Sequence, residues 1–183
     1  MNRDSAFQLL QQHTKSESLI KHMLAVEACM RAYAAKWQED EVKWGIVGLL
    51  HDFDYEMYPN PPDHPEKGAT ILKAYGYPDD VIYAIRSHAD YTGCPRKSLM
   101  DKTLFACDEL AGFITAVTLV RPDKKIHGLE PRSVRKKMKD KAFARSVNRD
   151  DMRLGAQELG VELDEHIAFC IQAMEGAAER LGL

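Results

Sequence analysis

Hydrophobic residues recur at alternating spacings of three and four over long parts of this chain. The first such stripe consists of Leu19, Met23, Val26, Met30, Tyr33 and Trp37. This spacing keeps the apolar side chains on one face of a helix and therefore predicts a long amphipathic helix. Thr14 and Glu17 stand before it with the spacing of a capping box, which predicts that the helix begins there.

Similar patterns predict further helices along the rest of the chain. Asp40 can cap a helix that carries an apolar run to residue 51. Asp63 to Glu66 form a second capping-box pattern, and the helix that begins there is expected to end at Gly76. Pro78 and Ser98 precede two more apolar periods, and a last one covers about residues 164–181. No internal repeat or strand pair is visible. The predicted fold class is all-α, a single-domain helical bundle.

Length and charge refine this picture. A chain of 183 residues favours one domain, spanning 1–183. We expect a core at about 16–120 and a basic helical extension at about 121–183, because residues 121–153 hold twelve Lys or Arg against five Asp or Glu. Such a run is typical of a solvated helix face, although it could also contact phosphate. The overall net charge of −3 gives no general attraction to nucleic acid or membrane.

The cysteines and the termini indicate the compartment. Cys29, Cys94, Cys107 and Cys170 are far apart and form no C-x-x-C pair, which argues against a zinc knuckle or a disulfide framework. The first residues are polar and do not resemble a signal peptide, and no apolar stretch reaches the length of a membrane span. These features predict a cytoplasmic protein without a membrane partner.

Histidines and aspartates on the apolar faces provide the candidate chemistry. They lie on or near the inward faces of five successive predicted helices: His22, His51, Asp52, His64, His88 and Asp108. A single buried histidine is usually a core residue with a backbone partner, but a buried carboxylate such as Asp108 costs several kcal/mol unless it is paired or bound to metal. Packing these faces together brings the six residues toward one another, and a divalent cation is the natural compensation.

The order His22, His51-Asp52 and Asp108 resembles the HD-domain superfamily of metal-dependent phosphohydrolases. The segments His64-Pro-x-x-Gly68-Ala69 and Ile85-Arg-Ser-His88, with Lys139 to Arg145, resemble its HDIG-type branch of predicted hydrolases. The resemblance implies a metal held by His22, His51, Asp52 and Asp108. It also implies a second metal at His64 and His88, with Asp52 bridging. The sequence departs from the motif at Phe53-Asp54, where an Ile-Gly pair would stand, and at Ala89, where a second histidine would stand.

On this resemblance we expect an enzyme that hydrolyses a small phosphorylated substrate with a metal-activated water. Asp52, Asp54 and Glu56 are the candidate catalytic residues, and Lys67 is a candidate substrate ligand; a solvated acidic turn and a surface lysine are the alternatives. The cofactor is one or two divalent ions among Mn, Fe, Co, Ni, Zn and Mg. We do not expect nucleic acid as a partner, and a homodimer stays open. The alternative functions are a mixed-valent di-iron oxygenase of the HD fold and a non-catalytic, metal-stabilised HD module.

Overall fold

The computed structural model describes residues 1–183 and contains helices joined by turns, with no strand. The α-helices are α1 (Arg3–His13), α2 (Glu17–Trp37), α3 (Glu41–Leu50), α4 (Asp63–Ala74), α5 (Asp79–Ser87), α6 (Leu99–Leu119), α7 (Pro131–Met138), α8 (Arg149–Leu159), α9 (Leu163–Glu175) and α10 (Ala178–Leu181). A short 3-10 turn, η1 (Asp90–Thr92), follows α5. The predicted all-α class is confirmed.

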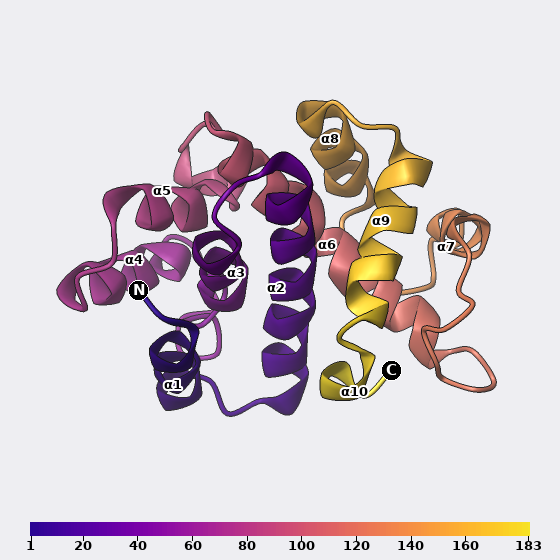
Figure 1. Cartoon of the computed structure of the whole chain (residues 1–183), viewed down its shortest axis with the longest axis horizontal. Coiled ribbons are helices and arrows are strands. Elements are labelled where there is room, and N and C mark those ends of the chain that lie inside the picture. The colour runs from indigo at the N-terminus through magenta and orange to yellow at the C-terminus, as the bar shows by residue number, and fades with distance from the viewer.

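The long helices α2 and α6 form the centre of the molecule. α2 packs against α3, α6 and α9, and α6 also packs against α5, α7 and α8 (Figure 1). The helices α1, α4 and α5 lie on one side of this centre, and α7, α8 and α9 lie on the other (Figure 1). Residues from both sides belong to one cluster of 43 buried apolar side chains, so the C-terminal helices share the core of the N-terminal ones.

The observed helix starts support some of the predicted caps and contradict others. Asp40 caps α3, and Ser98 and Asp101 form a capping box at the start of α6. The predicted box at Thr14 is wrong: Ser16 caps α2, whereas the Thr14 hydroxyl donates to the Phe53 carbonyl at 2.8 Å. A buried carbonyl beside Thr14 was a better partner than the exposed start of the helix.

The predicted cap of the third helix is also wrong. Asp63 is the first residue of α4 and makes no cap bond, and His64 has extended backbone angles (φ −80°, ψ 138°) within the first turn. This break turns the His64 ring away from the helix surface and into the protein, where the side chain is buried. The local irregularity therefore positions a candidate site residue.

No helix was predicted for the segment that forms α1, because its first residues are polar. Its Arg3 side chain forms two hydrogen bonds, of 2.7 and 2.8 Å, with the carboxylate of Glu27 on α2. Glu27 is buried and also accepts a hydrogen bond from Arg31, so its charge is compensated from both helices. Burial of Ala6, Leu9 and Leu10 completes the contact with the core.

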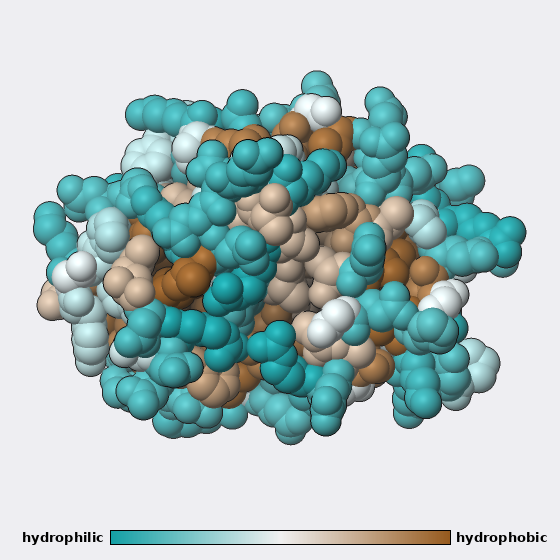
Figure 2. Space-filling view, viewed as in Figure 1, coloured by the Kyte–Doolittle hydropathy of each residue, from teal (hydrophilic) through white to brown (hydrophobic).

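The surface on the viewed face is predominantly hydrophilic, with smaller hydrophobic patches between the charged side chains (Figure 2). The large apolar side chains that are exposed are spread over several segments rather than gathered on one helix. No helix combines the length and hydrophobicity needed to cross a bilayer.

Candidate metal centre

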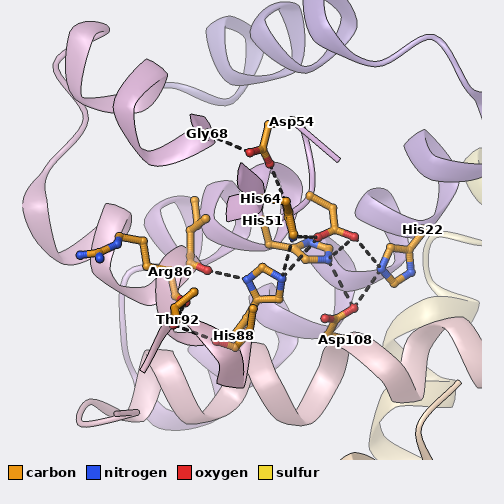
Figure 3. Close-up of polar contacts among 12 residues, drawn as sticks. His22, His51, Asp54, His64, Gly68, Arg86, His88, Thr92 and Asp108 are labelled. Carbon is orange, nitrogen blue, oxygen red and sulfur yellow. Dashed lines mark hydrogen bonds and ion pairs between the residues drawn. The ribbon is translucent and has the colours of Figure 1, made fainter. Parts of the chain in front are cut away.

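The six histidines and aspartates singled out from the sequence meet at the middle of the helical assembly. They come from separate elements: His22 from α2, His51 and Asp52 from the end of α3, His64 from α4, His88 from the end of α5, and Asp108 from α6. Figure 3 shows the four imidazole rings turned toward one another, with Asp108 facing His22. We call these six residues the His/Asp cluster.

One half of the cluster consists of His22, His51 and Asp108. Oδ1 of Asp108 lies 3.0 Å from Nε2 of His22 and 3.4 Å from Nε2 of His51. The potential ligand atoms of these three residues all lie within 4.8 Å of one another. Two imidazole nitrogens and one carboxylate oxygen at this spacing can hold a divalent cation.

The other half consists of Asp52, His64 and His88. Oδ1 of Asp52 lies 3.2 Å from Nε2 of His64 and 3.4 Å from Nε2 of His88. Their ligand atoms form a second group within 4.8 Å. The same types of ligand are therefore available twice, on opposite sides of Asp52.

Asp52 links the two halves through its two carboxylate oxygens. Whereas Oδ1 faces His64 and His88, Oδ2 lies 3.6 Å from Nε2 of His51 and 4.0 Å from Nε2 of His22. A carboxylate with one oxygen toward each group of ligands can bridge two cations.

Hydrogen bonds to the other ring nitrogens fix how three of the imidazoles point. Nδ1 of His51 donates to the Gly48 carbonyl at 2.8 Å, and Nδ1 of His88 donates to the Ile85 carbonyl at 2.5 Å. Because a carbonyl only accepts, these contacts place the proton on Nδ1 and leave the lone pair of Nε2 facing the cluster. Nε2 of His51 is the one buried side-chain nitrogen or oxygen without a hydrogen-bond partner, which fits a metal ligand.

His64 is oriented by a carboxylate. Its Nδ1 lies 2.8 Å from Oδ1 of Asp54, and the other oxygen of Asp54 accepts a hydrogen bond from the Gly68 amide at 2.8 Å. Asp54 is fully buried and lies on the side of His64 that faces away from the other imidazole rings (Figure 3). A carboxylate in this position holds the ring of a ligand histidine and increases its basicity. It does not reach a substrate itself.

Two other residues predicted from the sequence lie outside the cluster. The exposed carboxylate of Glu56 accepts hydrogen bonds from the backbone amides of Lys15 and Ser16 and so ties the start of α2 to the turn after α3. Lys67 is exposed on α4 and does not line the cavity at the cluster. Neither position gives direct support to a catalytic or substrate contact.

Attraction between the histidines and aspartates changes their proton affinities. Burial alone would lower the pKa of His64, but hydrogen bonds with Asp52 and Asp54 outweigh it and raise this pKa to about 9. Burial likewise opposes the shifts of His51 and His88, whose pKa values the nearby carboxylates raise. In the metal-free protein the carboxylates therefore favour the protonated form of these rings, and a bound cation can take over the compensation of their charge.

An open cavity of about 650 Å³ leads from the surface to the cluster. Its wall carries three further carboxylates, Asp90, Glu109 and Asp151, and no Lys or Arg. Burial, with the nearby Asp108 charge, raises the pKa of Glu109 to about 7. The exposed rings of Tyr55 and Tyr91 also line this cavity. Because no Lys or Arg lines the cavity, a metal bound at its floor would provide the positive charge for an anionic substrate.

The basic segment contributes to the cavity in an unexpected way. Ser146, Val147 and Asn148 form part of the wall, at the end of the loop between α7 and α8. The guanidinium of Arg149 donates to the carbonyls of Phe143, Ala144 and Val147 and lies over the Phe113 ring, with 5.0 Å from Cζ to the ring centroid. Arg149 therefore shapes the wall from behind and is not directed at a substrate phosphate.

Several residues of the cavity were not singled out from the sequence, among them Glu109, Tyr91 and Asn148. Glu109 follows Asp108 directly on α6, while Tyr91 and Asn148 lie in turns whose course cannot be deduced from periodicity. The backbone amide of Asn148 donates to Glu109 at 3.1 Å, which joins two of these positions. A carboxylate beside Asp108 on a helix facing the cluster was the one available signal.

The fold and the cluster define an all-helical domain able to hold divalent metal between its helices. The family model of the HD domain matches residues 19–112, just over half of the chain. The chain belongs to the HD domain family, and the resemblance seen in its motifs is confirmed. HD domains are typical of metal-dependent phosphohydrolases and bind divalent metals.

Curated relatives match just over half of the chain. Ribonuclease Y of Desulfotalea psychrophila is 32% identical over 100 residues, which are 52% of this chain and 18% of that protein. Ribonuclease Y of Oleidesulfovibrio alaskensis is 31% identical over 101 residues, 53% of this chain and 18% of the relative. Ribonuclease Y of Nitratidesulfovibrio vulgaris is 33% identical over 101 residues, again 53% of this chain and 18% of the relative. The matches thus span less than a fifth of these relatives, and no solved structure matches the chain.

Proposed function

We propose that this protein is a metal-dependent phosphohydrolase that acts on a small phosphorylated substrate. The observation that carries the proposal is the placement of Asp52, with one oxygen toward each half of the His/Asp cluster at the floor of the cavity. Two cations held in this way are a recurring arrangement in enzymes that cleave phosphoesters.

The residues of the His/Asp cluster suit two divalent cations. The proposed ligands are His22, His51 and Asp108 for one ion and His64 and His88 for the other, with Asp52 shared. When bound, the ions would lower the pKa of a water molecule toward neutrality and stabilise the charge on the phosphoryl oxygens. Asp54 is a positioning residue that keeps the lone pair of His64 Nε2 toward the cluster. The carbonyls of Gly48 and Ile85 do the same for His51 and His88.

The cavity favours a small substrate over a nucleic acid. The relatives are named as ribonucleases, which makes a phosphodiester of RNA the natural alternative. Proteins that follow an RNA backbone line their grooves with Lys and Arg and stack bases on aromatic rings. Tyr55 and Tyr91 offer rings here, but Asp90, Glu109 and Asp151 line the wall without any Lys or Arg, so a chain of phosphates would be repelled away from the metals.

A substrate panel with defined metal tests this proposal. Protein purified anaerobically and loaded with Mn, Fe or Co is assayed against phosphomonoesters, nucleotides, phosphonates and a short single-stranded RNA, followed by release of phosphate or cleavage products. We expect hydrolysis of a small ester, abolished together with metal retention in Asp52→Ala. His64→Ala and His88→Ala should each lower the metal content from about two ions to one, as expected for a shared bridging carboxylate.

His127 provides a matched control. Its side chain is almost fully exposed, pairs with Glu175 and does not line the cavity at the cluster, so His127→Ala should keep both metal and activity. Two bound irons with oxygen-dependent loss of substrate would instead assign an oxygenase, and cleavage of RNA alone would reject the small substrate. A fully loaded protein without any activity would favour a module stabilised by metal.

A further inference from the structure

A second group of metal-ligating side chains lies outside the His/Asp cluster, in the core between α2, α6 and α9. It contains Cys29, Cys107 and Cys170, whose side chains are fully buried and whose sulfurs lie within 4.8 Å of one another. The spacing of these residues in the sequence argued against a zinc knuckle, and the structure agrees, because each comes from a different helix. The fold nevertheless brings all three thiols to one point.

A histidine beside these thiols offers a nitrogen ligand. Nε2 of His166 lies 2.9 Å from the Ala106 carbonyl, which only accepts, so the proton of the neutral ring is on Nε2. Nδ1 therefore carries the lone pair; it lies 3.7 Å from Sγ of Cys170 and accepts a hydrogen bond from the Tyr33 hydroxyl at 2.6 Å. An imidazole held by a carbonyl at one nitrogen is the usual arrangement of a metal-bound histidine, and at His166 a bound ion would displace the Tyr33 hydroxyl from the other nitrogen.

We propose that Cys29, Cys107 and Cys170, with Nδ1 of His166, form a structural zinc site separate from the candidate active site. Three thiolates and one imidazole are a common ligand set for structural zinc, with zinc–sulfur bonds of about 2.3 Å. Such bonds require sulfurs about 4 Å apart, so the three sulfurs, which lie within 4.8 Å of one another, need adjustments of up to about 1 Å, and the ring of His166 must move toward them. Rotation of buried side chains supplies movements of this size without rearrangement of the helices.

The surroundings provide access for the ion and a compensating charge. A cavity of about 320 Å³ opens onto Tyr33 and His166, so an ion reaching it is one side chain from the thiols. Zinc with three thiolates and a neutral imidazole carries one net negative charge. The ammonium of Lys36 lines the same cavity, over the rings of Tyr33 and Phe169, and offsets this charge.

Binding is balanced by release of protons. The three thiols lose their protons to solvent and form three zinc–sulfur bonds, and the lone pair of His166 forms the fourth bond. The Tyr33 hydroxyl gives up its hydrogen bond to Nδ1, which requires the Tyr33 ring to move toward the cavity that it lines. No electron is transferred.

A zinc ion at this point would fasten together the helices that carry the candidate active site. Cys107 directly precedes Asp108 on α6, and Cys29 lies on α2 two turns beyond His22. The α9 helix, which carries Cys170 and His166, has no residue in the His/Asp cluster. The cross-link would therefore hold α2 and α6 at a fixed separation, whichever reaction the cavity supports.

Cobalt substitution tests the site in the intact chain. Protein is produced in cobalt-supplemented minimal medium, so that the ion can enter during folding, and is purified without oxygen. Thiolate–cobalt charge transfer gives a near-ultraviolet absorption that the His/Asp cluster cannot produce, because that cluster contains no cysteine. We expect this absorption in the wild type, with about one sulfur-bound ion per chain.

Cysteine variants identify the ligands. Cys29→Ala and Cys170→Ala should lose the thiolate absorption and about one metal equivalent, whereas Cys94→Ala, which changes the cysteine outside the group, should keep both. Should the buried variants fail to fold, X-ray absorption at the zinc edge of wild type decides, with three sulfur neighbours expected. Absence of sulfur ligands with three free thiols, or a disulfide in their place, would overturn the proposal.

Discussion

Gly68 allows a sharp test of the support behind His64. A Cβ added at residue 68 would lie 2.7 Å from Cγ and 2.8 Å from Oδ2 of Asp54, whereas ordinary contacts begin at 3.4 Å. In Gly68→Ala the carboxylate must therefore move by roughly 0.7 Å, which is difficult because Asp54 is fully buried and held by hydrogen bonds of 2.8 Å at both oxygens.

Two opposing effects set the size of the change in stability. Overpacking of this kind costs about 1–3 kcal/mol, and replacing a helical glycine by alanine returns about 0.5–1 kcal/mol. We expect the free energy of unfolding of Gly68→Ala to fall by about 1–2 kcal/mol. The larger effect should be on metal, because loss of the partner that orients a ligand histidine typically costs 10–100-fold in affinity.

Gly112 on α6 gives the matched control. A Cβ there would lie 3.7 Å from Nδ1 of His22, an ordinary contact, so Gly112→Ala should keep the metal affinity and gain about 0.5–1 kcal/mol in stability. Competition with a chelator measures affinity, and urea unfolding measures stability. If Gly68→Ala binds metal within about threefold of wild type, the reasoning that Asp54 positions His64 is refuted.

Three further predictions concern protonation, the cavity wall and a surface lysine. The pKa of His64, raised from 6.5 to about 9, implies that its contribution to the stability of metal-free protein is present below about pH 6.5 and lost as pH rises through about 9. Urea unfolding of chelator-treated protein at pH 6 and 9 should show this loss, and metal-loaded protein should not. Arg149→Met should lower the free energy of unfolding by about 2–3 kcal/mol and raise KM, because the carbonyls it binds in the cavity wall lose their donor; unchanged unfolding curves would contradict this. Lys67→Ala should leave kcat/KM within about twofold, since Lys67 does not line the cavity; a tenfold loss would restore its role in substrate binding.

Half of the His/Asp cluster could be predicted because three of its members follow a regular apolar period. His22 lies on the stripe of α2, His88 lies one turn after Ile85, and Asp108 lies one turn after Leu104. The helical period fixes the face on which a residue lies, and burial of that face fixes which side chains can meet. Neither rule gives distances, and so the two oxygens of Asp52 could be assigned to opposite halves only from the structure.

Asp54 and Glu56 show where this reasoning fails. Both follow a helix end in an acidic segment, and the sequence offered the same two interpretations for each, a catalytic residue or part of a solvated turn. The structure separates them, because Asp54 is fully buried against His64 and Gly68 while Glu56 is exposed and holds the start of α2. The difference depends on how the irregular turn after α3 runs, and hydrophobic periodicity carries no information about such turns.

Two features of the structure depend on contacts that only the folded chain makes, and the sequence did not reveal them. Arg149 was counted with the basic residues that could meet a substrate phosphate, yet its donors are used by the carbonyls of its own loop. The three buried cysteines were read as unrelated because none is near another in the chain, yet α2, α6 and α9 bring their sulfurs together. In both cases the chemistry of a side chain is determined by which donors or acceptors the fold leaves free. A positive charge near a proposed phosphate site is therefore a weak argument until its hydrogen bonds are known, and dispersed cysteines do not by themselves exclude a shared ion.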